Sequence, residues 1–278
     1  MMVLRLVGDF RRAMDLSLVL TAEAIPHELR QPAPDQWTLE IDESWQLRAE
    51  QALLAFEREN PRTPRAPPEE VPASAGIATG LGYFLAQLAF FVWTGPESDN
   101  AWFTRGAAEA AAILRGQWFR TLTALTLHAD AGHAVGNAVL GGLLLVLLSR
   151  KLGAALAALI VLLAGVGGTA LTAELMRDHF TSIGASTAVF GALGALAAVQ
   201  ARDPASRRQA WIPLGAGVAL LTFLGTGKRS DVSGHLCGFL CGALLGLLLA
   251  RVPRKLPAAL ALLAPAALAA AWWAALAH

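Results

Sequence analysis

The sequence predicts an all-α polytopic membrane protein, a bundle of about seven transmembrane helices preceded by a small α+β cytoplasmic domain. The chain of 278 residues is 55% hydrophobic and only 15% charged, and its mean hydropathy is +0.49, which is too apolar for a soluble domain of this length. Apolar segments recur after residue 75, and several approach the length of about 20 residues that crosses a bilayer. A proline-rich stretch at residues 61–75 separates them from a more polar beginning.

Residues 1–60 have the pattern of a small α+β domain. We expect, in order, a strand, a helix, two strands and a second helix, at residues 3–7, 9–24, 27–31, 37–41 and 43–59. Asp42 or Glu43 caps the second helix, which ends before Asn60 and Pro61. Charges run through the first residues without an apolar core and a small-residue cleavage site, so we expect no secretory signal. Five prolines mark residues 61–75 as a linker.

The predicted transmembrane domain, residues 76–278, contains seven apolar segments. They are residues 76–93, 133–148, 152–175, 185–201, 211–224, 233–250 and 256–276. Basic residues gather in the loops after the second, fourth and sixth segments, as Arg150, Lys151, Arg202, Arg207, Arg208, Arg251, Arg254 and Lys255. Because cytoplasmic loops carry an excess of Lys and Arg, we expect these loops and the N-terminus in the cytoplasm and the loop at residues 94–132 outside.

Four polar residues lie inside the predicted spans, where such side chains are costly and mark functional sites. They are His133, Asn137, Ser186 and His235. Each stands near the start of a span that runs from outside to inside, so all four are expected at a similar depth near the outer face. A serine becomes a nucleophile when an imidazole takes its proton, and the resulting oxyanion needs hydrogen-bond donors. No carboxylate third member is evident, so we predict a dyad of Ser186 and His235.

The oxyanion donors are expected on two segments. His133 and Asn137 are four residues apart and therefore share one helix face. Together with the backbone N–H of Ser186, they are predicted to bind the oxyanion. The contact between Ser186 and His235 requires two helices that approach closely, and small residues allow this approach. Glycines supply it in both segments, at Gly184, Gly191 and Gly194, and at Gly234, Gly238, Gly242 and Gly246.

In these residues the chain resembles the rhomboid family of intramembrane serine proteases. The resemblance rests on four segments, residues 117–121 (QWFRT), 127–137 (LHADAGHAVGN), 184–191 (GASTAVFG) and 234–242 (GHLCGFLCG). They are similar to the family's first outer loop with its Trp-Arg element, its His-x3-Asn, its Gly-x-Ser and its His-x2-Gly-x3-Gly. The positions that the resemblance marks as structural are Trp118, Arg120, Gly184, Gly238 and Gly242.

The resemblance, which covers roughly residues 76–250, implies a function. A bacterial-type rhomboid with six-plus-one transmembrane helices and a small N-terminal cytoplasmic domain would cleave transmembrane protein substrates within or next to their membrane helix. Ser186 would be the nucleophile, His235 the general base, and His133 and Asn137 the oxyanion donors, without a metal or cofactor. The protein would lie in a bacterial inner membrane, with its active site opening to the outer side of the lipid bilayer.

One position departs from the family, and two alternatives stay open. Active members usually have Gly after the nucleophile, whereas this chain has Thr187, whose branched side chain is expected to crowd the site. The first alternative is a catalytically inactive rhomboid-like protein that binds transmembrane helices. The second is a redox or transport protein with His133 and His235 as haem or proton-relay residues. A formal net charge of +1 argues against a nucleic-acid partner, and the sequence does not indicate an oligomeric state.

Overall fold

The computed structural model describes residues 1–33, 36–60, 73–98, 100–177, 180–203, 206–225, 231–249, 260 and 262–277. The chain divides into two compact units, Met1–Glu69 and Glu70–His278, each with its own core. Most of the predicted linker, residues 61–72, lies outside the described part, and so do Arg251, Arg254 and Lys255 of the predicted cytoplasmic loops. Helix α3 (Ala73–Thr94) begins within the last residues of that predicted linker.

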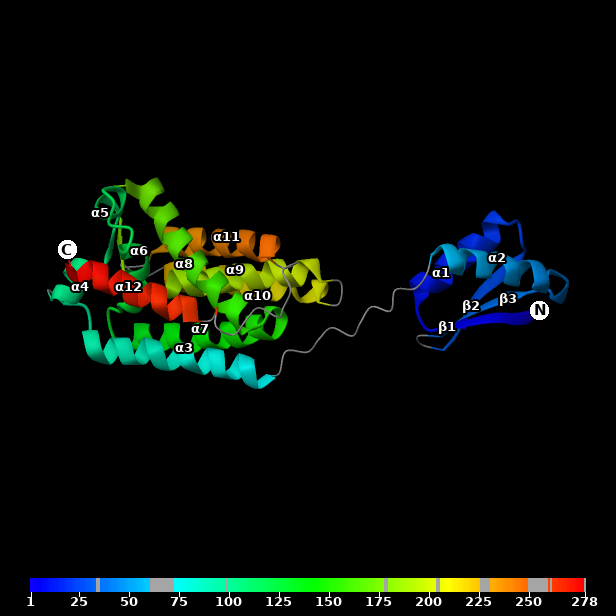
Figure 1. Ribbon diagram of the computed structural model, residues 1–278, viewed down its shortest axis with the longest axis horizontal. Helices are drawn as coiled ribbons and strands as arrows, with labels where there is room; N and C mark the ends of the chain where they lie inside the picture. Colours follow the sequence, from blue (N-terminus) through cyan, green and yellow to red (C-terminus); the bar gives the residue numbers. More distant parts are fainter. Residues whose placement is uncertain are drawn as a thin grey trace. The chain divides into compact units, whose positions relative to one another are not determined.

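The first unit is a three-stranded antiparallel sheet with two helices (Figure 1). Strands β1 (Met2–Val7) and β2 (His27–Ala33) both pair with the central strand β3 (Gln36–Ile41). Helices α1 (Phe10–Ala22) and α2 (Gln46–Glu59) complete the unit. Leu16 and Leu20 of α1, Leu53 of α2, and Leu39 and Ile41 of β3 form its buried core. The predicted small α+β region is therefore present.

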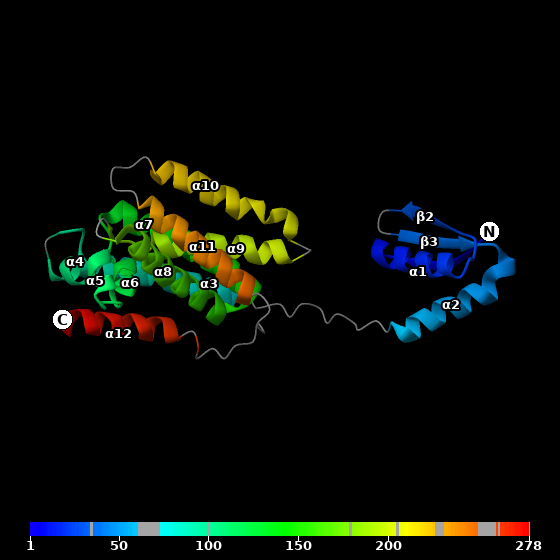
Figure 2. The ribbon, with the colours of Figure 1, turned by 90° about the horizontal axis from the view of Figure 1, so that it is seen from above.

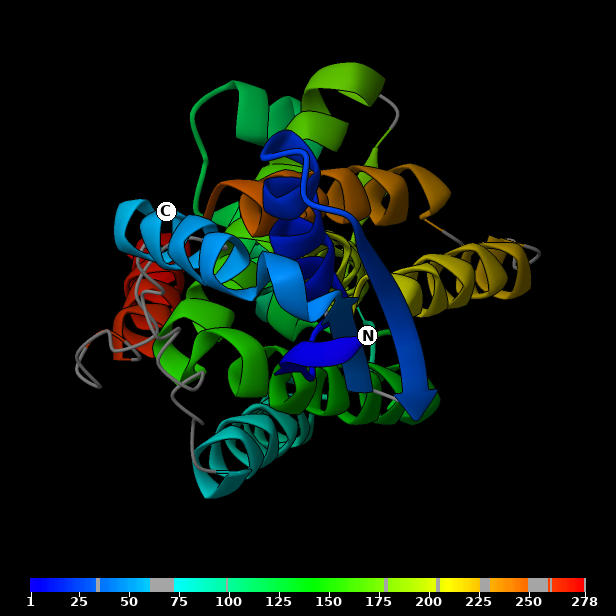
Figure 3. The ribbon, with the colours of Figure 1, turned by 90° about the vertical axis from the view of Figure 1, so that its right-hand side faces the viewer.

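The second unit is a bundle of long apolar helices, which run alongside one another in Figure 1. The long helices are α3, α7 (Ala131–Leu152), α8 (Ala154–Met176), α9 (Ser186–Arg202), α10 (Trp211–Gly225), α11 (Val232–Leu249) and α12 (Leu263–Ala277). Figures 2 and 3 show α10 and α12 on opposite edges of this bundle. Among the described helices, four are long and apolar enough to cross a membrane by themselves: α3 from Gly76, α7, α8 and α11. Helices α9, α10 and α12 are shorter, at 17, 15 and 15 residues.

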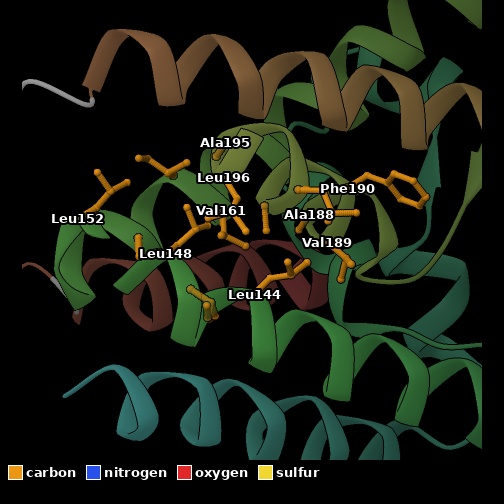
Figure 4. Close-up of a cluster of buried hydrophobic side chains, with 14 of the residues drawn as sticks. Leu144, Leu148, Leu152, Val161, Ala188, Val189, Phe190, Ala195 and Leu196 are labelled. Carbon is orange, nitrogen blue, oxygen red and sulfur yellow. The ribbon is translucent and has the colours of Figure 1, made fainter. Parts of the chain in front are cut away.

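Helix α9 lies at the centre of the bundle, and most of its side chains are buried. Leu144 and Leu148 of α7 and Val161 of α8 contribute to the same core as Val189 and Leu196 of α9 (Figure 4). Burial on several faces explains why α9 has no polar stripe along its length. The central position makes α9 the fixed element against which the neighbouring helices are placed.

Helices α9 and α11 approach so closely that their backbones touch. A methyl group added at Gly238 would overlap the carbonyl oxygen of Thr187, and one added at Gly242 would overlap that of Gly191. These positions are four residues apart on both helices, so the small residues form one continuous face along the interface. Glycine is the residue that fits at positions 238 and 242, because any side chain there would overlap the backbone of α9.

The connection between α3 and α7, which the sequence predicts as a long loop on the outer side and which we call the outer connection, is structured. It contains α4 (Ala101–Gly106), α5 (Ala110–Leu114) and α6 (Arg120–Thr123), and a short strand β4 (Ala108–Glu109) that pairs with β5 (Thr181–Ser182). The buried Arg120 guanidinium donates hydrogen bonds to the carbonyl oxygens of Ala107 at 2.8 Å and Thr104 at 3.0 Å, and to the Gln117 side chain at 2.6 Å. Burial lowers the pKa of Arg120 from its ordinary value. This one side chain therefore joins the end of α4 to the residues just before α6.

Candidate active site

Ser186 and His235 meet at the beginnings of two helices. Ser186 is the first residue of α9, and His235 lies in the first turn of α11. A hydrogen bond of 2.8 Å joins Ser186 Oγ and His235 Nε2. The His235 ring is buried and stacks on Phe190, with 4.4 Å between ring centroids and an interplanar angle of 16°. The glycine interface brings the two helices together, and Phe190 fixes the plane of the imidazole.

His133 and Asn137 converge on the residues just before Ser186. His133 Nδ1 accepts a hydrogen bond of 3.4 Å from the backbone N–H of Ala129, so its proton is carried by Nε2. A Cβ atom placed on Gly184 would lie 2.6 Å from His133 Nε2 and 3.6 Å from Asn137 Nδ2. Both side chains therefore present N–H donors to the space beside Gly184.

Gly184 has the conformation and the empty volume that this arrangement requires. Its φ of +116° lies where side-chain-bearing residues are strained, and its N–H donates a hydrogen bond of 2.8 Å to the carbonyl of Ala124 in the outer connection. The absent side chain leaves room for the two donors, because a Cβ atom at this position would collide with the His133 ring. The first N–H groups of α9, including that of Ser186, have no partner within the helix and carry the positive end of its dipole.

The other motif positions lie in the outer connection and in the helix interface. Trp118 is 58% exposed and Arg120 is buried in the outer connection, whereas Gly238 and Gly242 lie in the interface of α9 and α11. The structure therefore brings the four polar residues of the predicted spans together around Gly184, and Gly238 packs against the residue that follows Ser186.

Thr187 does not crowd the site, contrary to the sequence-based expectation. The residue is only 3% exposed. A Cβ atom on Gly168 of α8 would lie 2.8 Å from the Thr187 methyl group, and one on Gly238 would lie 3.0 Å from it. The methyl group therefore fills the contact between three helices. Because one residue turns a helix by about 100°, Thr187 points away from the direction of Ser186.

Three neighbours of the site were not predicted as site residues from the sequence. Phe190 follows Ser186 by four residues, so helical spacing was a signal for its place beside His235. His128 is fully buried, and its ring lies edge-on to His133 with 5.1 Å between centroids. Burial, with a smaller effect of His133, lowers the pKa of His128 to about 4. Asp231 precedes His235 by four residues, and its side chain accepts a hydrogen bond of 2.7 Å from the backbone N–H of Gly234.

The residues of this site suit acyl transfer rather than metal binding. Across the described part of the chain, no group of three or more His, Cys, Asp or Glu side chains is arranged to hold a metal ion. The described site instead supplies a hydroxyl, an imidazole bonded to it, and several N–H donors beside the hydroxyl. These are the elements that a serine nucleophile and a negatively charged tetrahedral intermediate require.

Comparisons with known proteins agree with this arrangement. Residues 115–252 match the family model of the rhomboid domain. The chain is also 31% identical, over 136 residues, to the protein named rhomboid protease GluP of Bacillus subtilis (strain 168). That match covers 47% of this chain and 26% of the relative, so the chain spans about a quarter of the relative's length. The family match contains the four polar residues of the site, and the chain belongs to the rhomboid family.

Proposed function

We propose that this protein is an intramembrane serine endopeptidase that cleaves membrane-anchored proteins within or next to their transmembrane helix. The observation that carries the proposal is the hydrogen bond of 2.8 Å between Ser186 Oγ and His235 Nε2. A serine at the start of an apolar helix has little reason to meet a buried histidine of another helix unless the pair performs chemistry. The similarity to a rhomboid protease supports the same class of reaction.

The proposed reaction is acyl transfer through a covalent intermediate. Ser186 Oγ attacks the carbonyl carbon of the scissile peptide while His235 Nε2 takes the hydroxyl proton. The carbonyl oxygen becomes an oxyanion, which accepts hydrogen bonds from the Ser186 backbone N–H, His133 Nε2 and Asn137 Nδ2. His235 then gives its proton to the departing amine, and the acyl-enzyme forms. Water, deprotonated by the same imidazole, hydrolyses the acyl-enzyme and restores Ser186.

We also propose an orientation for the protein in a bacterial cell membrane. Helices α7 and α9 begin at the site and end at basic residues, Arg150 with Lys151 and Arg202 respectively. Because Lys and Arg concentrate on the cytoplasmic side, this end of the bundle faces the cytoplasm and the site opens to the outer side. The N-terminal unit is then cytoplasmic. The bacterial relative supports a bacterial membrane, and the partners are transmembrane substrates within the lipid bilayer.

Labelling with a fluorophosphonate probe tests the proposal without a known substrate. The probe reacts with an activated serine, so detergent-solubilised wild type should label, whereas Ser186→Ala and His235→Ala should not. Ser149 is a buried serine near the far end of α7, and Ser149→Ala is the matched control that should label normally. Thermal unfolding of each variant verifies that it is folded. A folded wild type that stays unlabelled would overturn the proposal and favour the inactive helix-binding alternative.

The haem alternative has a separate test. It requires His133 and His235 as free axial ligands, but His235 is bonded to Ser186 and His133 faces Gly184. The purified protein should therefore show no Soret absorption band.

A further inference from the structure

Asp231 stands immediately before α11 and is fixed by its own hydrogen bonds. Its Oδ1 accepts one from the backbone N–H of Gly234 at 2.7 Å and one from the Ser233 hydroxyl at 3.2 Å. Its backbone carbonyl accepts one from the N–H of His235 at 3.0 Å. These contacts are typical of a helix N-cap, and they hold the carboxylate one helical turn before the imidazole of His235.

The second carboxylate oxygen is not explained by capping. Asp231 Oδ2 is buried and has no hydrogen-bond partner among the described residues, and the same is true of His235 Nδ1. A cap needs one oxygen, and Asn or Ser would supply it equally well. A buried, unpaired charged oxygen is costly. Gly234 also leaves space for the carboxylate, since a Cβ atom there would lie 2.6 Å from Asp231 Cγ. The free-energy cost of the unpaired oxygen and the room that Gly234 provides for it both suggest that the negative charge of Asp231 has a function.

The electrostatic surroundings of His235 indicate what that use is. Within the described part of the chain, the titratable groups that act on His235 are Asp231 at the start of its own helix and His133 from α7. Of these two groups, the carboxylate of Asp231 is the one that attracts a positive charge. On α9, the groups against the ring are the uncharged Ser186 and Phe190. Asp231 is therefore the group that attracts the proton which His235 takes from the serine.

We infer that Asp231 is a positioning residue for His235: its carboxylate, held by the cap of α11, orients the imidazole and stabilises the imidazolium that forms when Ser186 attacks. This inference rests on the proposed function and changes the dyad into a dyad with an electrostatic third member. The carboxylate acts through His235 and does not touch the substrate. Its place in the chain, four residues before the base, follows from helix geometry, because residues at this spacing share one face.

Three substitutions distinguish the effect of the Asp231 charge from the effect of its capping hydrogen bond. Asp231→Asn and Asp231→Ser keep a capping oxygen and lose the charge, whereas Asp231→Ala loses both. Asp42 also caps a helical turn, through a bond of 3.0 Å from the Ser44 N–H, so Asp42→Asn is the matched control in the N-terminal unit. Asn and Ser variants should unfold near the wild-type temperature, and the Ala variant about 2–4 °C lower.

The deciding measurement is the protonation of His235 in the full-length chain, followed by NMR of isotope-labelled histidines in detergent and assigned with His235→Ala. Loss of an opposite charge one turn away should lower the protonation midpoint by about one pH unit in both the Asn and Ser variants. The rate of fluorophosphonate labelling should fall roughly 10- to 100-fold. In a plot of this rate against pH, the decrease on the acidic side should move to lower pH, as the protonation midpoint does. An unchanged midpoint in Asp231→Asn would overturn the inference. Because this titration needs no catalysis, an unlabelled wild type would count against the proposed function separately.

Discussion

A single methyl group at Gly242 should both destabilise the bundle and inactivate the site. In Gly242→Ala, the new Cβ would overlap the carbonyl oxygen of Gly191 and lie 2.7 Å from its Cα, whereas ordinary contact begins at 3.4 Å. Neither neighbour is a flexible side chain that can rotate away. Because the carbonyl group lies closer still than the Cα, relief requires α9 and α11 to separate by at least about 0.7 Å.

The same displacement reaches the site because both helices are rigid. Gly242 lies two turns after His235 on α11, and Gly191 follows Ser186 by five residues on α9. A separation of about 0.7 Å would stretch the bond of 2.8 Å between Ser186 and His235 to about 3.5 Å, where a hydrogen bond is nearly lost. We expect overpacking to cost about 1–3 kcal/mol of stability and labelling to slow by roughly 100-fold or more, since proton transfer depends on that contact.

Thermal unfolding in detergent and the rate of fluorophosphonate labelling measure the two effects on one preparation. Gly215→Ala on α10 is the matched control, because a Cβ there meets no atom within 4 Å and stability should change by less than about 0.5 kcal/mol. Wild-type stability and labelling in Gly242→Ala would refute the reasoning, since the two backbones would then not be in contact. A loss in Gly215→Ala of the same size would show that any added methyl group is harmful.

Three further predictions concern one neighbour of the site, one residue of the helix interface and one residue of the outer connection. Burial lowers the pKa of His128 to about 4 from an ordinary 6.5. As the pH decreases, the unfolded chain therefore binds a proton at this residue before the folded chain does. Folding stability should fall by up to about 3 kcal/mol between pH 6.5 and pH 4. His128→Phe should lose less folding stability than wild type between these two pH values. An equal loss of stability in the variant would exclude His128 as the cause. Thr187→Ser removes only the methyl group that contacts Gly168, so the free energy of unfolding should decrease by about 1 kcal/mol. The labelling rate should stay within about twofold of wild type. A large change in the labelling rate would show that Thr187 affects the active site after all. Arg120→Lys cannot reproduce the fork that bonds two carbonyls and Gln117, so it should destabilise the protein by about 2 kcal/mol in thermal unfolding, and wild-type stability would contradict this role.

Much of the fold followed from local patterns. The apolar segments gave the positions of the long helices, and the alternation in residues 1–60 gave the three strands of the first unit. The outer connection was different, because α4, α5 and α6 have only four to six residues each. Helices of this length have no clear apolar periodicity, and their stability comes from tertiary contacts such as those of Arg120. Such elements are therefore hard to derive from a single sequence.

The sequence indicated which polar residues lie near one another, but not the directions of the side chains around them. Span position predicted that Ser186, His133, Asn137 and His235 lie in one layer, and in the structure His235 bonds to Ser186 while His133 and Asn137 lie beside Gly184. The direction of each side chain depends on the residue at which its helix begins. Because α9 begins at Ser186 itself, the next residue, Thr187, turns into the helix interface. A boundary error of one or two residues is enough to reverse that assignment.

The caps of the three helices that carry the site differ in a way that suits the chemistry. Asp130 caps α7 with a bond of 2.8 Å from the His133 N–H, and Asp231 caps α11 through Gly234. Helix α9 has Ala185 in the cap position and no side-chain bond to its first N–H groups. A carboxylate there would occupy the donors and repel an oxyanion. Each of the two capped helices thus carries a histidine in its first turn, close after a capping aspartate, whereas the uncapped helix keeps its N–H groups free for the oxygen that becomes charged.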